Sequence, residues 1–385
     1  MNILVQNPYM QAGGAENRIR NLLEVLINRN DIDVIHFMFI GQETAHNIQS
    51  DGKFHLWQVR KDNVLGATKN IIKEFDIDIV QLHNNQMIGT DGIEYAQSIG
   101  IPTIWVMHDF WTLCAMRFMI PVWDAMKHPV CDKIDQDKCT QCVGDYEWRI
   151  TKQQREVVNN CDVAIVPSER IKKIFERNNF MVGKLKVIVP WITLDKFHPT
   201  GASHDGMQVF FAGNFIQHKG IMVLLKAWAI VQKRLPQARL VIQGDSRMGF
   251  QTSNFINSLG LQNVRMMNHM PQEQLRNLFN TSAVTVFPSI WEETFGQVWA
   301  ESLACGTPVI ASKIGGIADT MKEGGVFFEP RNHVELAENI IDLLLSPSKR
   351  QVLANAGVNY VRTAFTRERA AAEFVELYYK LEARI

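Results

Sequence analysis

The sequence of 385 residues has few cysteines and no excess of charge of either sign. Six cysteines are too few for a disulfide framework in a chain of this length, which favours a compartment where thiols stay reduced. Forty basic residues balance forty acidic ones, so the basic surplus that is typical of nucleic-acid binders is missing. We therefore expect no nucleic-acid partner.

Long hydrophobic segments are missing as well. No run of about 18 uncharged apolar residues occurs, so the sequence predicts no membrane span. The first residues, Met1–Val5, lack the basic start of an export signal and have the pattern of a buried strand. From these absences we expect a cytoplasmic protein that makes at most peripheral contact with the inner face of the membrane.

The residues that are present indicate a globular α/β protein. Hydrophobic residues make up 46% of the chain and charged residues 21%, and the length exceeds what one core usually holds. Short apolar runs alternate with amphipathic stretches from end to end. The runs are apolar on both faces, as expected for a parallel sheet covered by helices on both sides. We expect two Rossmann-like, doubly wound domains facing a central cleft.

The pattern also places the elements and the domain boundary. Strands are predicted over 2–6, 33–40, 77–83, 103–108, 163–167 and 185–189 in the first half, with a helix over 15–28. In the second half strands are predicted over 209–212, 239–243, 264–267, 284–287, 308–311 and 325–328, and helices over 221–234, 272–280, 297–305 and 334–345. Proline and glycine in 191–206 indicate a linker, so the domains are expected at 1–190 and 207–364.

Candidate binding residues in the first half follow predicted strands. Asn7–Glu16 lies between the first strand and a helix, where Gly13 and Gly14 let the backbone approach a ligand and the helix start offers N–H donors to an anion. A plain glycine turn is the alternative interpretation. His108 ends another strand, where it can bind a hydroxyl group or stabilise developing charge near a phosphate; a structural histidine is the alternative.

In the second half, a lysine follows a short loop after the first strand. Gly213 and Asn214 end that strand, and Lys219 precedes the next helix. A lysine at a helix start can reach a phosphate and adds its charge to the helix dipole. A surface lysine beside a capping glycine is the alternative.

Two glutamates eight residues apart form the most informative pattern. Glu293 precedes the predicted helix over 297–305, Thr294, Phe295 and Gly296 lead into its start, and Glu301 lies within it. One carboxylate can bind sugar hydroxyls while the other reaches a ribose, and the N–H groups between them can bind a diphosphate. An acidic helix start favoured by the dipole would explain the first glutamate but not Glu301.

Together these residues resemble glycosyltransferase family 4, the retaining group 1 enzymes with the GT-B fold, over nearly the whole chain. The family's most specific signature is a glutamate pair of this spacing, followed by a small-residue helix, a Gly-x-Pro-Val-Ile run and a glycine pair. Glu293 and Glu301, Gly306–Ile310, and Gly315 with Gly316 match it.

The resemblance implies a metal-independent transfer of a sugar from a nucleotide-diphosphate-sugar donor to a glycan, lipid-linked or small-molecule acceptor. It gives the sugar hydroxyls to Glu293, the ribose to Glu301 and the nucleobase to Met270. The residues expected to bind the donor are Gly13, Gly14, Gly213, Asn214, Lys219, Met270, Glu293, Thr294, Phe295, Gly296 and Glu301, and those expected to be catalytic are His108, Glu293 and Lys219. It also implies that the first domain lies on the acceptor side and that a helix within 365–385 crosses back onto it.

One position departs from the family pattern. Asn214 stands where the family usually has an arginine that binds the diphosphate together with the lysine. Loss of one such donor costs roughly 3–4 kcal/mol in other enzymes, and Arg247 is the candidate substitute. Two alternatives stay open: a sugar-nucleotide epimerase of the same fold, and a catalytically silent nucleotide-sugar-binding partner, which Asn214 favours.

No cofactor is expected for catalysis, but four cysteines suggest a structural ion. Cys139 and Cys142 form a Cys-x2-Cys pair with Cys114 and Cys131 upstream, a zinc pattern if the loop folds back. Unligated thiols or a disulfide are the alternatives. The nearby apolar run over 116–123 could contact a lipid-linked acceptor or pack the loop. Asp76–Asp78 resembles a metal-binding motif of another glycosyltransferase fold but leads into a strand.

Overall fold

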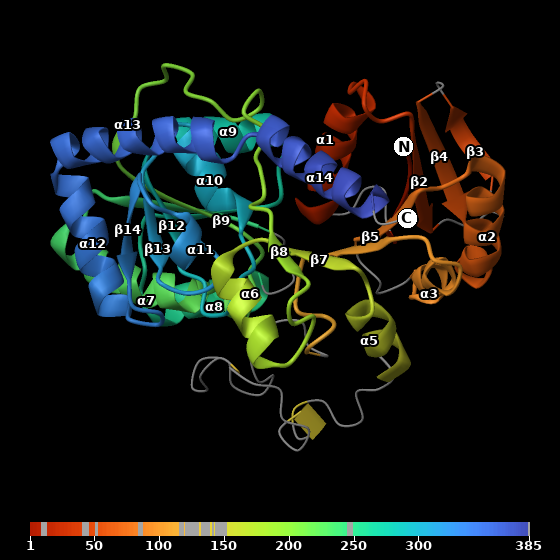
Figure 1. Ribbon diagram of the computed structural model, residues 1–385. Helices are drawn as coiled ribbons and strands as arrows, with labels where there is room; N and C mark the ends of the chain where they lie inside the picture. Colours follow the sequence, from red (N-terminus) through yellow and green to blue (C-terminus); the bar gives the residue numbers. More distant parts are fainter. Residues whose placement is uncertain are drawn as a thin grey trace. The chain divides into compact units, whose positions relative to one another are not determined.

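The computed structural model describes residues 1–8, 14–40, 46–50, 53–83, 88–114, 119, 131, 139–140, 142, 152–244 and 249–383. The chain divides into two compact units (Figure 1). The first unit contains most of Met1–Trp191 together with the final segment from Arg367. The second unit contains Ile192–Thr366. Each unit is a helix-covered sheet, as the apolar pattern predicted. In the described residues, no helix is both long and apolar enough to cross a membrane.

The described part of the first unit contains an eight-stranded sheet of order β3-β4-β2-β1-β5-β6-β7-β8. All neighbouring strands are parallel except β3 and β4. The strands are β1 (Asn2–Gln6), β2 (Val34–Ile40), β3 (His46–Ser50), β4 (Phe54–Val59), β5 (Ile79–Leu82), β6 (Thr103–Val106), β7 (Val163–Val166) and β8 (Leu185–Val187). The helices are α1 (Gly14–Ile27), α2 (Val64–Phe75), α3 (Asp91–Ser98), α5 (Lys152–Asn159), α6 (Glu169–Arg177) and α14 (Arg367–Glu382), and a 3-10 turn, η1, spans Lys61–Asn63.

Strands β3 and β4 are the part of this sheet that the sequence pattern missed. β3 is a polar pentapeptide, and β4 shows neither alternation nor a continuous apolar run, since its buried positions are Leu56 and Val59. β4 pairs in parallel with β2, and β3 adds an antiparallel edge. Asp78, in the motif before β5, accepts a hydrogen bond from the backbone N–H of Asn2 at 2.6 Å, a structural role at the amino-terminal edge of the sheet.

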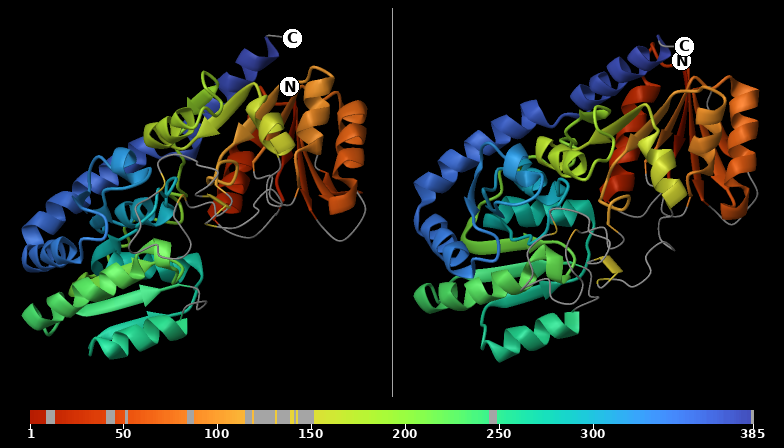
Figure 2. Two further views of the ribbon diagram at one scale, coloured as in Figure 1. Left: turned by 90° about the horizontal axis from the view of Figure 1, so that it is seen from below. Right: turned by 60° about the horizontal axis from the view of Figure 1, so that its bottom comes forward.

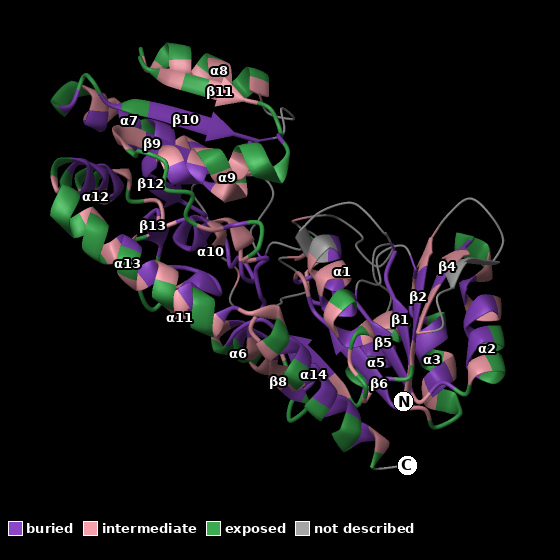
Figure 3. Ribbon diagram, turned by 90° about the horizontal axis from the view of Figure 1, so that it is seen from above, coloured by how far each residue is buried: buried purple, intermediate pink, exposed green. Residues whose placement is uncertain are grey.

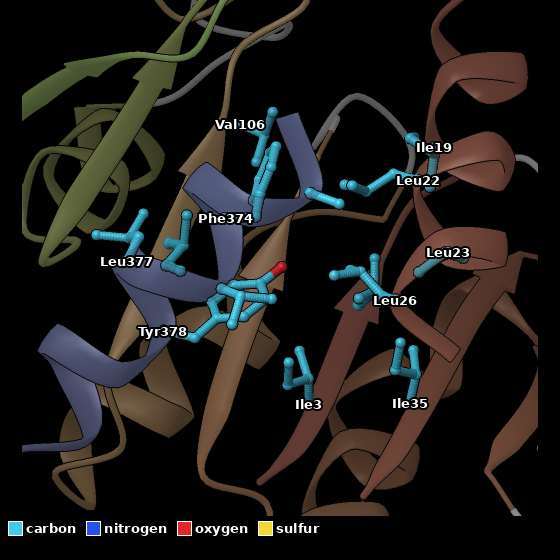
Figure 4. Packing of buried hydrophobic residues seen from close by; sticks show 14 of the residues in the cluster. Ile3, Ile19, Leu22, Leu23, Leu26, Ile35, Val106, Phe374, Leu377 and Tyr378 are labelled. Carbon is cyan, nitrogen blue, oxygen red and sulfur yellow. The ribbon is translucent and has the colours of Figure 1, made fainter. Parts of the chain in front are cut away.

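Helices α1 and α14 lie together on one face of the first sheet. Helix α1 contributes Ile19 and Leu22, and α14 contributes Phe374 and Tyr378, to one buried cluster that also contains Ile3 of β1. Figure 4 shows side chains from the two helices meeting over the strands. The last helix therefore completes the core of the unit that contains the first strand.

The second unit has a sheet of order β11-β10-β9-β12-β13-β14, all parallel. The strands are β9 (Asp205–Ala212), β10 (Arg239–Gln243), β11 (Val264–Met267), β12 (Ser282–Phe287), β13 (Val309–Ser312) and β14 (Gly325–Phe328). The helices are α7 (Ile221–Arg234), α8 (Gly249–Ser258), α9 (Gln272–Thr281), α10 (Gln297–Ala304), α11 (Ile317–Thr320), α12 (His333–Leu345) and α13 (Pro347–Ala364), and η2 spans Gln217–Lys219. The expected strands and helices of this half are found to within a few residues.

Helices cover both faces of the second sheet. α7 contacts α8 and α12, while α10 contacts α9 and α13 (Figure 2). Figure 3 shows the consequence, since the central strands are buried and exposed residues lie on the outer sides of α12 and α13. Parallel strands buried on both faces have continuous apolar sequences, which is why they could be found from sequence.

The expected linker over 191–206 differs from the structure at both ends. Trp191 is buried in the first unit, where its ring contacts Phe374 edge-on, and β9 already begins at Asp205. Likewise, the segment expected to return to the first domain from 365 begins at Arg367, because Phe365 packs against Trp299 in the second unit.

Candidate active site

The order of the second sheet places two loops side by side. β9 and β12 are neighbours in the sheet. After β9 the chain continues to β10 on one side, and after β12 it continues to β13 on the other, so β9 and β12 form the switch point of the sheet. Ligands of such sheets bind beyond the carboxyl ends of the strands at this point. The loop after β9 contains Gly213, Asn214 and Lys219, and the loop after β12 contains Glu293 and Thr294.

These two loops are in direct contact. Ile290 donates its backbone N–H to the carbonyl oxygen of His218 at 2.9 Å. Gly220 has a φ of 74°, and a Cβ at this position would lie 1.7 Å from the carbonyl oxygen of Pro288. Because a residue other than glycine would collide with that backbone, Gly220 permits the approach that brings Lys219 to the β12 loop.

Lys219 and Glu293, predicted to bind different parts of a donor, form an ion pair in the structure. Ser289 donates its hydroxyl to the second carboxylate oxygen of Glu293 at 2.8 Å. Glu293 is 6% exposed, and the Lys219 side chain is about a quarter exposed. A fixed carboxylate beside a fixed ammonium can bind sugar hydroxyls and a phosphate at adjacent positions.

The predicted glycine pair holds the backbone of Glu293. Gly316 donates its N–H to the Glu293 carbonyl oxygen at 2.7 Å. Gly315 has a φ of 70°, and a Cβ there would lie 2.5 Å from the same oxygen. Glu292, adjacent to Glu293, accepts the Gly315 N–H at 3.0 Å through its carboxylate. The spacing between the glutamates and the glycine pair therefore reflects a contact that orients Glu293.

Glu293 lies outside α10, before its N-cap residue Gly296, and the first turn of the helix contains no acidic side chain. The alternative interpretation, an acidic helix start, is therefore wrong for Glu293. Thr294 and Phe295 are buried, and the Phe295 ring contacts Trp299, so the segment turns its side chains inward at the helix start. N–H groups at such a start are donors for an anion.

Glu301 lies in the second turn of α10 and is half-buried. Burial raises the pKa of its carboxyl group to about 7. Met270, the residue expected near a nucleobase, is buried between β11 and α9, beyond the carboxyl end of β11. A carboxylate that binds the two hydroxyls of a ribose must be ionised to accept from both, so its pKa bears on nucleotide binding.

We propose that Glu301 binds the ribose of a nucleoside diphosphate, which should then bind about tenfold more tightly at pH 8 than at pH 6, as the ionised fraction of Glu301 rises across its pKa. Without ligand, folding stability changes with pH in the opposite direction, because the folded Glu301 carboxyl group binds its proton more tightly than the unfolded one. Its contribution to folding stability falls as the pH rises from 4.5 toward 7. Isothermal titration at several pH values measures the binding effect.

The control is Glu301→Gln, which keeps the shape and removes the titration. Its remaining pH dependence belongs to the phosphate of the nucleotide. An identical pH slope in both proteins would show that Glu301 takes no part in binding.

Asn214 is exposed at the beginning of the loop that follows β9. Arg247, its suggested substitute, lies outside the described residues. Other groups do surround Lys219: the ammonium lies 5.7 Å from the centre of the Trp291 ring, and the His218 ring contacts Trp291 edge-on. Burial, followed by the charge of Lys219, lowers the pKa of His218 to about 4, so this ring is neutral near pH 7.

The first unit contributes its own candidate residues at the carboxyl ends of β5 and β6. His108 follows β6 and is half-buried, and Gly14 begins α1. The His108 ring stacks on His83, which follows β5, and its Nδ1 lies 3.4 Å from Arg18 Nη2 on α1. Gly13 lies outside the described residues.

The four cysteines of the predicted zinc site are all half-buried. Where the structure is described, no three or more cysteine, histidine or acidic side chains lie close enough together to hold a metal ion. Most of the loop between these cysteines lies outside the described residues, and the zinc site stays a prediction. Of the apolar run beside them, Met119 is described and is buried.

Three residues near the candidate sites were missed from the sequence. Ser289 holds Glu293, Trp291 lies over Lys219, and His83 contacts His108. Ser289 and Trp291 belong to the segment that contains the glutamate, so the signal was present. His83 ends a predicted strand on the same edge as His108, and that shared position was the signal for it.

Two family models match consecutive parts of the chain. The model described as Glycosyltransferase Family 4 matches residues 12–196, and the model described as Glycosyl transferases group 1 matches residues 195–360. A D-inositol 3-phosphate glycosyltransferase from Paenarthrobacter aurescens is 25% identical over 361 residues, covering 87% of this chain and 82% of that protein. An uncharacterized glycosyltransferase from Methanocaldococcus jannaschii is 26% identical over 233 residues, which span 60% of this chain and 58% of that one.

Solved structures show the same fold over the full length. Sucrose-phosphate synthase from Thermosynechococcus elongatus matches with a TM-score of 0.77 and 20% identity, covering all of both chains. Anabaena HepE, solved in complex with UDP and glucose, matches with a TM-score of 0.73 and 16% identity over 99% of this chain and all of that one. The chain thus belongs to the group 1 glycosyltransferases, family 4, and is a glycosyltransferase with the GT-B fold.

Proposed function

We propose that the protein is a retaining transferase that moves a sugar from a nucleotide-diphosphate-sugar donor, bound at the second unit, to a glycan, lipid-linked or small-molecule acceptor. The observation that carries this proposal is the ion pair of Lys219 with Glu293 at the switch point of the second sheet. The pair places a cation, which a diphosphate requires, next to a carboxylate, which can accept hydrogen bonds from sugar hydroxyls.

The chemistry follows from where charge develops. As the bond between the sugar carbon and the diphosphate oxygen breaks, negative charge grows on the diphosphate and the sugar becomes oxocarbenium-like. Lys219 and the N–H groups at the start of α10 offer positive charge to the leaving group. Glu293 binds sugar hydroxyls. The acceptor oxygen then bonds to the sugar carbon on the face that the diphosphate leaves, and the acceptor proton passes to a diphosphate oxygen.

We expect turnover of a sugar nucleotide that survives chelation of divalent ions, because the charge on the diphosphate is met by Lys219 and backbone donors. A thermal-shift screen of nucleotide sugars identifies the donor, starting with UDP-glucose, since structures of the same fold contain UDP and UDP-glucose. A donor at 100 times its dissociation constant adds about 2.7 kcal/mol of stability. Release of nucleoside diphosphate is then measured with and without EDTA.

Each other outcome identifies an alternative. Rapid loss of turnover in EDTA that is restored by magnesium or manganese would contradict the metal-independent mechanism. Conversion of the donor to an isomer without acceptor would favour an epimerase. Binding without any turnover would favour the silent partner, the alternative that Asn214 supports. Slow loss of turnover in EDTA, with zinc found by elemental analysis, would instead point to an ion at the four cysteines.

A further inference from the structure

Trp291 is an aromatic residue in the loop after β12, two residues before Glu293. It is 6% exposed, and the Lys219 ammonium lies 5.7 Å from the centre of its ring. A cation within about 6 Å of a ring centre is attracted by the negative face of the ring, and tryptophan attracts it most strongly. Lys219 therefore has an aromatic neighbour in addition to its ion pair with Glu293.

Contacts between the two loops keep the ring and the lysine close together. Ile290, the residue before Trp291, donates its N–H to the carbonyl oxygen of His218, the residue before Lys219. The His218 ring meets Trp291 edge-on, with ring centres 5.3 Å apart and an angle of 72° between the planes. Burial, followed by the charge of Lys219, lowers the pKa of His218 to about 4. This ring is therefore neutral near pH 7 and does not compete with Lys219 as a cation.

A lysine needs such neighbours if it is to stabilise charge that develops on a leaving group. Its ammonium is a compact charge at the end of a flexible four-carbon chain. A donor contributes most to the rate when it is already fixed where the charge will develop. The Lys219 side chain is about a quarter exposed, so part of it faces solvent and its charged end depends on specific partners to stay in place.

The two partners of the ammonium differ in what a bound donor would ask of them. The Glu293 carboxylate, which also accepts from Ser289 at 2.8 Å, is the group assigned to the sugar hydroxyls. Hydroxyl groups that donate to this carboxylate compete with Lys219 for its charge. The face of Trp291 has no such second task in the proposed function, so its attraction for the ammonium is the same with and without a donor.

We propose that Trp291 is a positioning residue that holds the Lys219 ammonium, by cation–π attraction to the face of its ring, where the diphosphate of the donor binds. The inference rests on the proposed function, which assigns Lys219 to the diphosphate. In this role Trp291 acts on the reaction through Lys219, and its effect depends on the electron density of the ring as well as on its size.

The contact is measured first, without any ligand. Protons over the face of an aromatic ring resonate upfield, so in protein labelled at the lysine Cε the signal of Lys219 should be shifted upfield. Its loss in Lys219→Met assigns it. In Trp291→Leu, which has no ring, the signal should move to the position of Lys226, an exposed lysine on α7. A Lys219 signal that is unshifted in the wild type would overturn the inference.

Fluorinated tryptophans separate cation–π attraction from packing. Fluorine changes the size of the ring little but withdraws electron density from its face, so each added fluorine weakens the attraction for a cation. In protein made with mono-, di- and trifluorotryptophan, we expect kcat and the affinity for UDP to fall stepwise, about five- to tenfold in all. The chain has nine tryptophans, so Trp291→Phe made with the same amino acids is the matched control. An equal trend in this control would overturn the inference.

A double-mutant cycle tests whether the ring acts through the lysine. Trp291→Leu alone should lower kcat about tenfold, since it removes the aromatic face. Lys219→Met keeps the length of the side chain without its charge, and in this background the same replacement should change kcat less than about twofold. Comparable losses in both backgrounds would show that Trp291 acts independently of Lys219 and would overturn the inference.

The outcomes separate this inference from the proposed function. A stepwise loss of UDP affinity with fluorination, together with no turnover of any sugar nucleotide by the wild type, would support the role of Trp291 and contradict the proposed function. An active wild type whose kcat and UDP affinity stay constant along the fluorinated series would overturn the inference and leave the proposed function in place.

Discussion

Deletion of residues 367–385 is expected to abolish the stable fold of the first unit while the second unit stays folded. The deleted helix supplies seven buried side chains to the core of the first unit: Ala370, Ala371, Phe374, Val375, Leu377, Tyr378 and Leu381. One buried phenylalanine is worth about 3–5 kcal/mol when cut to alanine, and a whole domain is stable by only about 5–15 kcal/mol. The second unit has its own core, in which Phe279 contacts Phe197 and Phe210.

Hydrogen exchange followed by mass spectrometry measures both units at once. In the truncated protein, amides of β1 and β5 should exchange rapidly, and those of β9 and β12 should stay protected. Phe374→Ala gives a milder version, with a loss of about 3–5 kcal/mol confined to the first unit. Tyr379→Ala, at an exposed position of the same helix, should stay within about 0.5 kcal/mol of the wild type. Undisturbed protection of β1 and β5 after truncation would contradict the role of α14.

Replacement of Lys219 by alanine is expected to lower kcat roughly 100- to 1,000-fold, the usual effect of removing one donor to developing negative charge. The same change removes the cation beside the buried Glu293 carboxylate and leaves the hydrogen bond from Ser289 at 2.8 Å, so the sugar-binding group is also expected to shift. Steady-state release of nucleoside diphosphate measures the rate. Lys226→Ala is the matched control, because Lys226 is an exposed lysine on α7.

Glu293→Gln separates the two roles of this ion pair. The amide keeps the size of the side chain but loses the charge that binds hydroxyl donors. We expect UDP to bind with nearly unchanged affinity and UDP-glucose to bind more weakly, as titration calorimetry would show. Equal losses for both ligands would contradict the assignment of Glu293 to the sugar, and a Lys219→Ala rate equal to that of Lys226→Ala would contradict the assignment of Lys219 to the diphosphate.

Much of the fold and part of the site could be predicted from the sequence. Buried parallel strands such as β10 and β13 have largely apolar runs with turn residues at each end, which fix their limits. The edge strand β3 offers no such contrast. The two glutamates were evident because their relation is local, eight residues along one segment.

The contacts that arrange these residues could not be predicted. The ion pair of Lys219 and Glu293 spans 74 residues and exists because β9 and β12 are neighbours, a fact of strand order that no local pattern carries. The bond between Tyr378 and Gln81 spans 297 residues. Gln81 lies inside an apolar strand, where a single polar residue gives no indication of its partner.

The position of α14 also governs the order in which the protein can fold during synthesis. Because residues from Arg367 onward complete the core of the first unit, that unit leaves the ribosome unfinished and must wait while the second is made. At about 5–20 residues per second, the wait lasts roughly 10–40 s. Throughout that interval the apolar face of α1 that α14 later covers is exposed to the cell. The segment made first is therefore the last to be finished, and it is the part of the nascent chain that most needs a chaperone.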